Sequence, residues 1–221
     1  MIKLSGPMVP PRRGGPPTRA MVLLHGYGSD GNDLIGLASY WRELLPGAMF
    51  VAPNAPEPCR DNPAGYQWFP IDFERPDYRF EGAGRAAPVI REFLADLWRQ
   101  TDLEPEDTIL AGFSQGAMMA LHVGLSLDAA LLGVIGFSGA LIAPAGFLDD
   151  VGPRPPICLV HGERDQVVDP DLSAQAAAIL RGRGFDVRFH VEPGAGHTIT
   201  EDGLAFASAF IASLAPQAAQ G

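Results

Sequence analysis

The segment Gly112-Phe113-Ser114-Gln115-Gly116 places a serine between two glycines, where its hydroxyl can serve as a nucleophile. Residues 108–111 before it are typical of a short buried strand, and the apolar residues after it open a helix. A serine between strand and helix takes a sharp, strained turn, and the flanking glycines let the chain segments pass closely. Such a turn exposes the hydroxyl and directs helix N–H groups toward it. We therefore predict that Ser114 is a nucleophile.

Two further residues supply the groups that a serine nucleophile requires. The hydroxyl reacts only when a neighbouring base takes its proton, and histidine titrates near neutrality. His197 comes after the alternating, strand-like residues 187–191, and Asp165 follows the apolar residues 157–160. An acid beside the histidine fixes its tautomer and stabilises the imidazolium that forms. We predict that His197 is the base and Asp165 the acid.

The elements before these residues are what bring them together. Ser114, Asp165 and His197 each lie just past the carboxyl end of a predicted strand. In an open parallel sheet these ends share one rim, where ligand crevices form. The chain order of serine, acid and histidine matches that of the α/β-hydrolase triad.

The acid role has two other candidates. Asp169 precedes Pro170 and has the character of a helix cap. Glu163 is a weaker rival in the same segment. Asp165 is preferred because it falls in the tight turn directly after the strand.

A second serine and two histidines also follow strands. Ser138, in Phe137-Ser138-Gly139, is the rival nucleophile, but it lacks the full glycine flanking of Ser114. His25 and His161 each precede a glycine, and no Cys or Glu-x-x-His cluster supports a metal there. We interpret both as structural histidines that are hydrogen-bonded near the site.

The charge on a tetrahedral intermediate requires backbone donors. The N–H of Gln115, directly after the nucleophile, is one candidate. A second donor is expected in the loop of residues 25–31, which follows the predicted strand 21–24. A preorganised donor of this kind contributes about 3 kcal/mol to transition-state stabilisation.

With these motifs the chain resembles the phospholipase/carboxylesterase family of α/β-hydrolases, which includes acyl-protein thioesterases and small bacterial carboxylesterases. The matching segments, from about Ala20 onward, are Leu24-His25-Gly26-Tyr27-Gly28-Ser29-Asp30-Gly31, Ala52-Pro53-Asn54-Ala55-Pro56, Gly65-Tyr66-Gln67-Trp68-Phe69, Gly112-Phe113-Ser114-Gln115-Gly116, Phe137-Ser138-Gly139, His161-Gly162-x-x-Asp165 and Gly196-His197. The resemblance implies hydrolysis of esters or thioesters without a metal or organic cofactor. It also implies an oxyanion hole formed by the N–H groups of Tyr27 and Gln115.

Two features separate the chain from the family's acyl-protein thioesterases. Those proteins often carry Trp-Phe-Asp, whereas Trp68-Phe69 is followed here by Pro70. No cysteine stands beside Met1 for acylation, as it does in some eukaryotic members. A bacterial-type carboxylesterase is therefore the closer likeness.

The substrate pocket is predicted to have an apolar wall. Trp68, Phe69 and Ile71 lie in the long loop whose family counterpart borders the active site, and Leu141 and Val167 should approach the same rim. These residues bring little positive charge to hold a phosphate group. We expect short-to-medium acyl esters to be preferred over acetyl esters and long-chain phospholipids.

Strands and helices are predicted to alternate along the chain. The predicted strands are residues 21–24, 48–52, 108–111, 133–137, 157–160 and 187–191, and the predicted helices are residues 34–45, 86–98, 115–125, 171–181 and 199–214. Residues 53–84 are predicted to form a long loop. This alternation favours an α/β-hydrolase fold with a mostly parallel sheet and helices on both faces. We expect residues 20–221 to form a single α/β-hydrolase domain, with residues 1–19 as an irregular N-terminal arm that is part of the same domain.

Composition excludes several kinds of partner. The 221 residues carry a formal net charge of −10, which disfavours nucleic acid and anionic membranes. The sequence has no apolar run long enough to span a bilayer, and its first residues lack an apolar signal core. We expect a cytoplasmic protein with a small-molecule ester substrate, with a homodimer left open.

The sequence thus favours a serine carboxylesterase that forms an acyl-enzyme on Ser114. A thioesterase or lysophospholipase on the same fold is the alternative. A lactone hydrolase of the dienelactone type would be expected to carry cysteine in place of Ser114. A non-catalytic binding protein usually lacks a triad member, and none is missing in this sequence.

Overall fold

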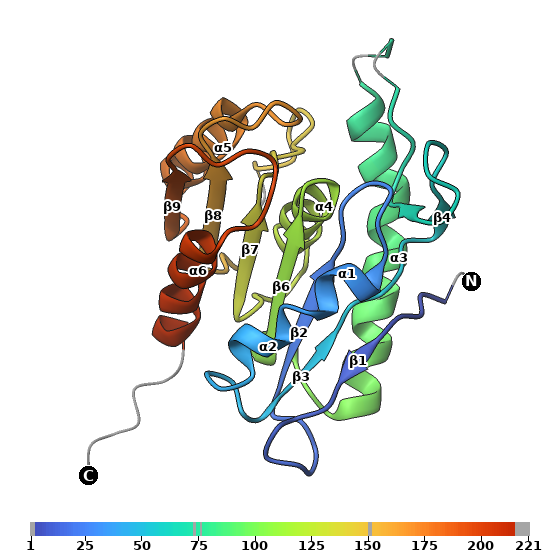
Figure 1. The fold of residues 1–221 in the computed structure, drawn as a ribbon, viewed down its shortest axis with the longest axis vertical. Coiled ribbons are helices and arrows are strands. Elements are labelled where there is room, and N and C mark those ends of the chain that lie inside the picture. The colour runs from blue at the N-terminus through green and yellow to red at the C-terminus, as the bar shows by residue number, and fades with distance from the viewer. Residues whose placement is uncertain (1–2, 73, 76, 150–151, 215–221) are drawn as a thin grey trace.

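The computed structural model describes residues 3–72, 74–75, 77–149 and 152–214. Its main sheet contains the strands β1 (Met8–Val9), β2 (Arg19–Leu24), β3 (Ala48–Val51), β6 (Thr108–Phe113), β7 (Gly133–Phe137), β8 (Ile157–Gly162) and β9 (Val187–Glu192). Their order across the sheet is β1-β3-β2-β6-β7-β8-β9 (Figure 1). β1 pairs antiparallel with β3, and the other pairs are parallel. The predicted mostly parallel sheet is confirmed.

Helices cover both faces of this sheet. They are α1 (Gly31–Ile35), α2 (Ala38–Trp41), α3 (Tyr78–Thr101), α4 (Gln115–Gly124), α5 (Pro170–Gly182) and α6 (Glu201–Leu214), with a 3₁₀ turn at Pro105–Asp107. Side chains alternate along β2, so Val22 packs in the core with α3, α4 and α5, whereas Leu23 packs in the core with α1, α2 and α6. The predicted two-sided α/β-hydrolase arrangement is confirmed.

The strand order changes direction between β2 and β6. β2 pairs with β3 on one side and with β6 on the other, and Leu24 at its end lies opposite Gly112. Ligand crevices in open α/β sheets form at such a switch point, outside the carboxyl ends of the strands. The Ser114 turn leaves β6 at this point.

One predicted helix is divided in the structure. Residues 34–45 were expected to form a single helix, but α1 ends at Ile35 and α2 covers only Ala38–Trp41. At this break, the N–H groups of Leu37 and of Ser39, the second residue of α2, donate to carbonyls three positions earlier. These tighter turns interrupt the α-helical pattern around Gly36.

The predicted long loop is shorter than expected. α3 begins at Tyr78, and β4 (Glu57–Pro58) pairs with β5 (Tyr66–Gln67) in a two-stranded sheet. Gly82 was interpreted as a loop residue, but it lies inside α3, where a Cβ would overlap the Phe69 ring. The glycine permits close packing between the helix and the loop.

The N-terminal arm joins the sheet through β1. Met8 pairs with Val51, so this part of the arm forms a short strand at the edge of the sheet. Within the described ranges, no helix combines the length and the apolar composition that crossing a membrane requires.

Candidate active site

Ser114 occupies a strained turn between β6 and α4. Its φ of 55° lies in the left-handed region that residues with a side chain rarely adopt. A Cβ at Gly116 would overlap the carbonyl oxygen of Leu24, and a Cβ at Gly112 would overlap the backbone of Gly116. Only glycine permits these approaches, so the two flanking glycines hold the start of α4 against the ends of β2 and β6.

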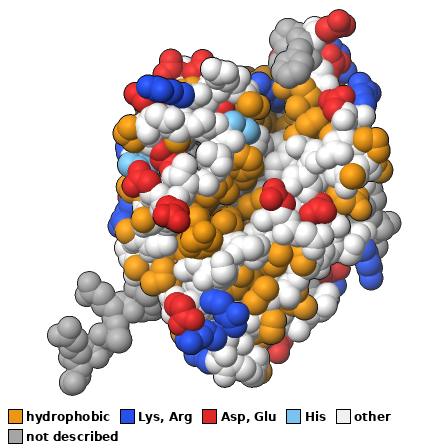
Figure 2. Space-filling model, in the orientation of Figure 1, with side chains coloured by type: hydrophobic (Ala, Val, Ile, Leu, Met, Phe, Trp, Pro, Cys, Tyr) orange, Lys and Arg blue, Asp and Glu red, His pale blue; other side chains and the backbone are white. Residues whose placement is uncertain are grey.

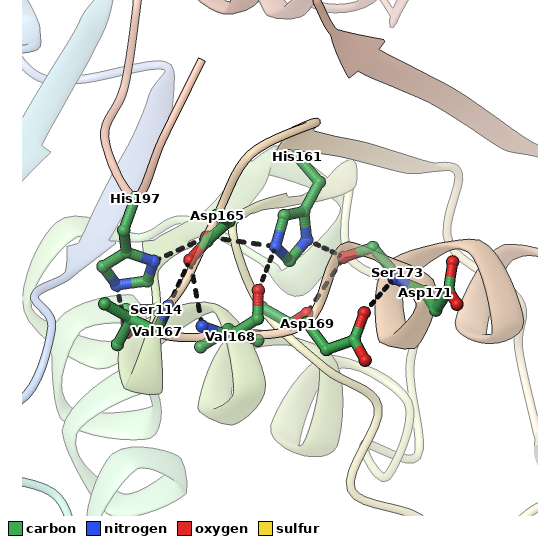
Figure 3. A network of polar contacts seen from close by, with 10 residues as sticks. Ser114, His161, Asp165, Val167, Val168, Asp169, Asp171, Ser173 and His197 are labelled. Atoms are coloured by element: carbon green, nitrogen blue, oxygen red, sulfur yellow. Dashed lines mark hydrogen bonds and ion pairs between the residues drawn. The ribbon is translucent and has the colours of Figure 1, made fainter. Parts of the chain in front are cut away.

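Ser114, His197 and Asp165 form a continuous chain of hydrogen bonds (Figure 3). Ser114 Oγ lies 3.0 Å from His197 Nε2, and His197 Nδ1 lies 2.7 Å from Asp165 Oδ2. An ionised carboxylate only accepts hydrogen bonds, so Nδ1 donates to Asp165. In the neutral imidazole Nε2 is then the acceptor for the serine hydroxyl. The three residues expected to meet at the rim are together.

Asp165 is held in its ionised form. Its Oδ1 accepts backbone hydrogen bonds from Val167 at 2.8 Å and Val168 at 2.9 Å. Burial opposes the negative charge, but the hydrogen bonds from His197, Val168 and Val167 outweigh it and hold the pKa of Asp165 below its ordinary value. The acid beside His197 is therefore an acceptor at neutral pH.

The rival acids have other partners. Asp169 caps α5 by accepting the backbone N–H of Asp171 at 3.0 Å. Glu163 accepts the backbone N–H of Gly194 at 2.8 Å. No hydrogen bond to His197 is found for either acid within the described residues.

Ser138, the rival nucleophile, also lies apart from the base. Its residue is 1% exposed, and its Oγ has no hydrogen-bond partner within the described part of the chain. The structure thus brings Ser114, and not Ser138, to His197.

A cavity of about 260 Å³ opens beside Ser114 and His197. Its apolar lining consists of Phe69, Ile71, Tyr78, Phe113, Met118, Val167 and Val168. On the face shown in Figure 2, hydrophobic side chains gather near the N-terminal end of α3. The cavity therefore combines the Ser114 side chain with a largely apolar wall.

The predicted wall is correct at three positions and is corrected at two. Phe69, Ile71 and Val167 line the cavity. Trp68 does not, because it is 1% exposed and its indole N–H donates to the carbonyl of His25 at 2.9 Å. Leu141 lines a separate cavity against α5.

The Gln115 side chain anchors the cavity wall, which the sequence analysis missed. Its Oε1 accepts the backbone N–H of Trp68 at 2.9 Å, and its Nε2 donates to the carbonyl of Phe69 at 2.8 Å. Only the backbone of Gln115 was assigned a role from the sequence. Its position directly after the nucleophile was the available signal, but the contact joins segments distant in sequence.

Two charged residues in the cavity were also missed. Arg79 and Asp33 both line it, although little positive charge was expected there. Arg79 Nε donates to the Tyr78 hydroxyl at 3.0 Å, and Asp33 accepts a hydrogen bond from Ser29 at 2.8 Å. The predicted loop extended through residue 84, so Arg79 was not expected to lie in a helix.

Both candidate oxyanion donors line the cavity with Ser114. Gln115 is the first residue of α4, where an N–H has no carbonyl to pair with inside the helix. Tyr27 lies in the loop after β2. Burial, followed by the hydrogen bond of the Tyr27 hydroxyl to Asp61, raises the pKa of Tyr27 above its usual value. Tyr27 therefore presents a neutral hydroxyl directed at Asp61.

His25 is a neutral, buried residue behind the site. Its Nδ1 lies 2.8 Å from the carbonyl of Gly26, and its Nε2 lies 3.0 Å from the backbone N–H of Ala55. Nδ1 therefore donates and Nε2 accepts. Burial lowers the pKa of His25, which agrees with this tautomer and with the structural role expected for it.

Known proteins resemble this chain along most of its length. A crystal structure of esterase PE8 superposes with a TM-score of 0.93 at 51% identity, covering 97% of this chain and 100% of that one. Acyl-protein thioesterase 1 of Gibberella zeae is 28% identical over 90% of this chain and 92% of its own length. Esterase YpfH of Escherichia coli is 29% identical over 87% of this chain and 81% of its own length.

A more distant structure shares the fold. The Bacillus cereus carboxylesterase superposes with a TM-score of 0.78 at 16% identity, covering 96% of this chain and 95% of that one. The family described as phospholipase/carboxylesterase matches residues 10–215. The chain therefore belongs to the phospholipase/carboxylesterase family, and it is a hydrolase.

Proposed function

We propose that this protein is a serine carboxylesterase that hydrolyses short-to-medium acyl esters through an acyl-enzyme on Ser114. The observation that carries this proposal is the hydrogen-bond chain from Ser114 Oγ through His197 to Asp165 at the mouth of an apolar cavity. Each group has the hydrogen-bonding role that nucleophilic catalysis requires.

Acylation begins when His197 Nε2 takes the proton of Ser114 as Oγ bonds to the ester carbonyl carbon. Asp165 stabilises the imidazolium, and the backbone N–H groups of Tyr27 and Gln115 receive the oxyanion. His197 then protonates the alcohol oxygen as the carbon–oxygen bond breaks. In deacylation, water attacks the acyl carbon, His197 carries its proton back to Ser114 Oγ, and the carboxylic acid leaves.

The cavity supports the proposed substrate size. Its volume of about 260 Å³ lies slightly below the 300–1,000 Å³ typical of small-molecule sites. Phe69, Ile71 and Met118 offer apolar surface to an acyl chain, and each buried methylene contributes up to about 0.8 kcal/mol. Catalytic efficiency should therefore rise with chain length until the cavity is full.

Thioester or lysophospholipid hydrolysis is a second candidate, favoured by Arg79. Arg79 lines the cavity and offers a cation to the phosphate of a lysophospholipid or of an acyl-CoA thioester. Acyl-protein thioesterase 1 of Gibberella zeae is among the similar proteins. The same triad would serve either chemistry.

Labelling with a fluorophosphonate probe tests the nucleophile. Intact-mass and peptide analysis should find one adduct, on Ser114, and the Ser114→Ala variant should not be labelled. An adduct on Ser138 in the wild-type protein would contradict the proposal.

A substrate series separates the two candidate functions. We expect kcat/KM for p-nitrophenyl esters to increase from acetyl to medium chains and to exceed that for acyl-CoA thioesters of equal chain length. Ile71→Ala should flatten the chain-length profile, and Leu141→Ala, which changes a different cavity, is the matched control. Faster thioester turnover that Arg79→Gln removes would favour the thioesterase.

A further inference from the structure

His161 lies directly behind the acid of the proposed triad. It is the fifth residue of β8, it is fully buried, and its Nε2 lies 3.1 Å from Asp165 Oδ2. The same Nε2 lies 2.9 Å from the carbonyl oxygen of Val168. His161 does not line the cavity beside Ser114. Figure 3 shows its ring on the far side of Asp165 from His197.

Both oxygens of Asp165 are therefore occupied. Oδ1 accepts the N–H groups of Val167 and Val168, and Oδ2 lies within reach of His197 Nδ1 and His161 Nε2. The two backbone donors belong to the same loop as Asp165. His161, in contrast, belongs to β8, which pairs with β7 and β9 in the main sheet.

The surroundings of His161 determine where its hydrogen lies. Val168 O and the ionised Asp165 can only accept, so Nε2 of His161 carries a hydrogen. Its Nδ1 lies 2.7 Å from Ser173 Oγ, which also lies 2.9 Å from Gly139 O. If the hydroxyl proton points to Nδ1, the ring is neutral; if it points to Gly139 O, Nδ1 must donate and the ring is cationic. Nε2 is a donor in both cases.

We propose that His161 is a positioning residue for ester hydrolysis, which holds the turn of residues 165–168 through the hydrogen bond from its Nε2–H to Val168 O and keeps that N–H 3.1 Å from Asp165 Oδ2. The inference rests on the proposed function of the triad. The hydrogen bond restrains the turn whose backbone N–H groups bind Oδ1, and the polar N–H beside Oδ2 favours the charged carboxylate, so Asp165 remains an acceptor when His197 becomes protonated. His161 thus acts through Asp165 and touches no reacting atom.

Substitutions that keep or remove the donor test this role. His161→Leu removes it, whereas His161→Gln retains an amide N–H that can reach toward Asp165. We expect His161→Leu to lower kcat about 10- to 100-fold with KM changed less than threefold, and His161→Gln to recover much of the loss. Such a kcat-selective loss marks an interaction made in the transition state.

His122 provides the matched control. It is also a buried histidine, but its Nδ1 bonds to the carbonyl of Ile142, and among the described residues it makes no hydrogen bond to the triad. Replacing it with leucine should leave kcat within threefold of the wild type. Thermal unfolding of every variant shows whether lost activity reflects lost folding.

A spectroscopic readout separates positioning from general support of the fold. The proton of the His197–Asp165 hydrogen bond should shift or broaden in His161→Leu, persist in His161→Gln and remain unchanged in His122→Leu. If His161→Leu does not fold, nitrogen–proton NMR of the wild type still tests the claim, since His161 Nε2 must be protonated. An unprotonated Nε2, or an unchanged kcat and unchanged proton signal in folded His161→Leu, would overturn the inference. Wild-type labelling at Ser114 tests the proposed function separately.

Discussion

The turns after β6 and β7 have similar backbones and different surroundings. Ser114 and Ser138 each follow a strand, and their φ values are 55° and 50°. The strands are neighbours, with Phe113 opposite Phe137, and Ser114 N–H donates to Phe137 O. Two serines in left-handed turns therefore stand side by side at the same edge of the sheet.

The difference lies in what meets each hydroxyl. Ser114 begins α4 and reaches His197 at the cavity, whereas Ser138 Oγ is buried with no partner among the described residues. A strained serine turn alone therefore does not bring a hydroxyl to a histidine. The contact with His197, which follows β9, and the cavity beside α4 distinguish the two positions.

The largest expected effect is on turnover. Ser114→Ala should lower kcat by about 10⁴- to 10⁶-fold, because no other group can form the acyl-enzyme. Ser138→Ala should keep kcat within about threefold of the wild type, because its hydroxyl does not contact His197. Steady-state hydrolysis of a p-nitrophenyl ester measures both, and comparable losses would erase the distinction between the turns.

Asp165, which is hydrogen-bonded to His197 beside Ser114, gives the next contrast. Asp165→Asn should lower kcat about 10³- to 10⁴-fold, because the amide favours the wrong tautomer of His197. Asp169→Asn alters only the cap of α5 and should cost less than about tenfold in kcat, since it lies outside the triad. If Asp169→Asn lowers kcat more than Asp165→Asn does, the acid role belongs to Asp169.

The sequence predicted the positions of Ser114, Asp165 and His197 relative to one another better than it predicted the lining of the cavity. Apolar runs such as residues 133–137 marked the strands, and the rule that parallel strand ends share a rim placed Asp165 and His197 beside Ser114. The direction of the Trp68 side chain was unpredictable because it depends on His25 and Gln115, which come from distant segments. Gly82 was included in the predicted loop 53–84, because the close packing of this helical glycine against Phe69 is visible only in three dimensions.

A smaller effect is expected on the free energy of unfolding, which Ser138→Ala should increase and Ser114→Ala should not. A buried hydroxyl without a partner costs about 1–3 kcal/mol, so Ser138→Ala should increase the free energy of unfolding by about 1 kcal/mol. Ser114→Ala gains nothing similar, since it gives up the hydrogen bond to His197. Urea denaturation of both variants provides the test, and a destabilised Ser138→Ala would show that the hydroxyl has a favourable contact.

The smallest expected effect is a pH dependence of the free energy of unfolding, which Asp165→Asn should alter and Ser138→Ala should not. The pKa of Asp165 is lowered on folding, so its charge stabilises the protein above the unfolded value of about 3.9. That contribution is lost as pH falls through the lower, folded-state pKa. The stability difference between wild type and Asp165→Asn should therefore shrink below about pH 4. The stability difference between wild type and Ser138→Ala should stay constant over the same pH range, because no ionisable group is changed. If this difference shrinks equally, the pH dependence does not come from Asp165.

The glycines beside Ser114 have a consequence for how this enzyme can diversify. Gly112 and Gly116 meet backbone atoms, so no change in a neighbouring side chain makes room for a larger residue there. The cavity wall, by contrast, is largely built from side chains such as Ile71 and Val167. Substitutions in the wall can therefore change the shape of the cavity one side chain at a time while the Ser114 turn keeps its position. The wall is thus the natural target for engineering new specificities.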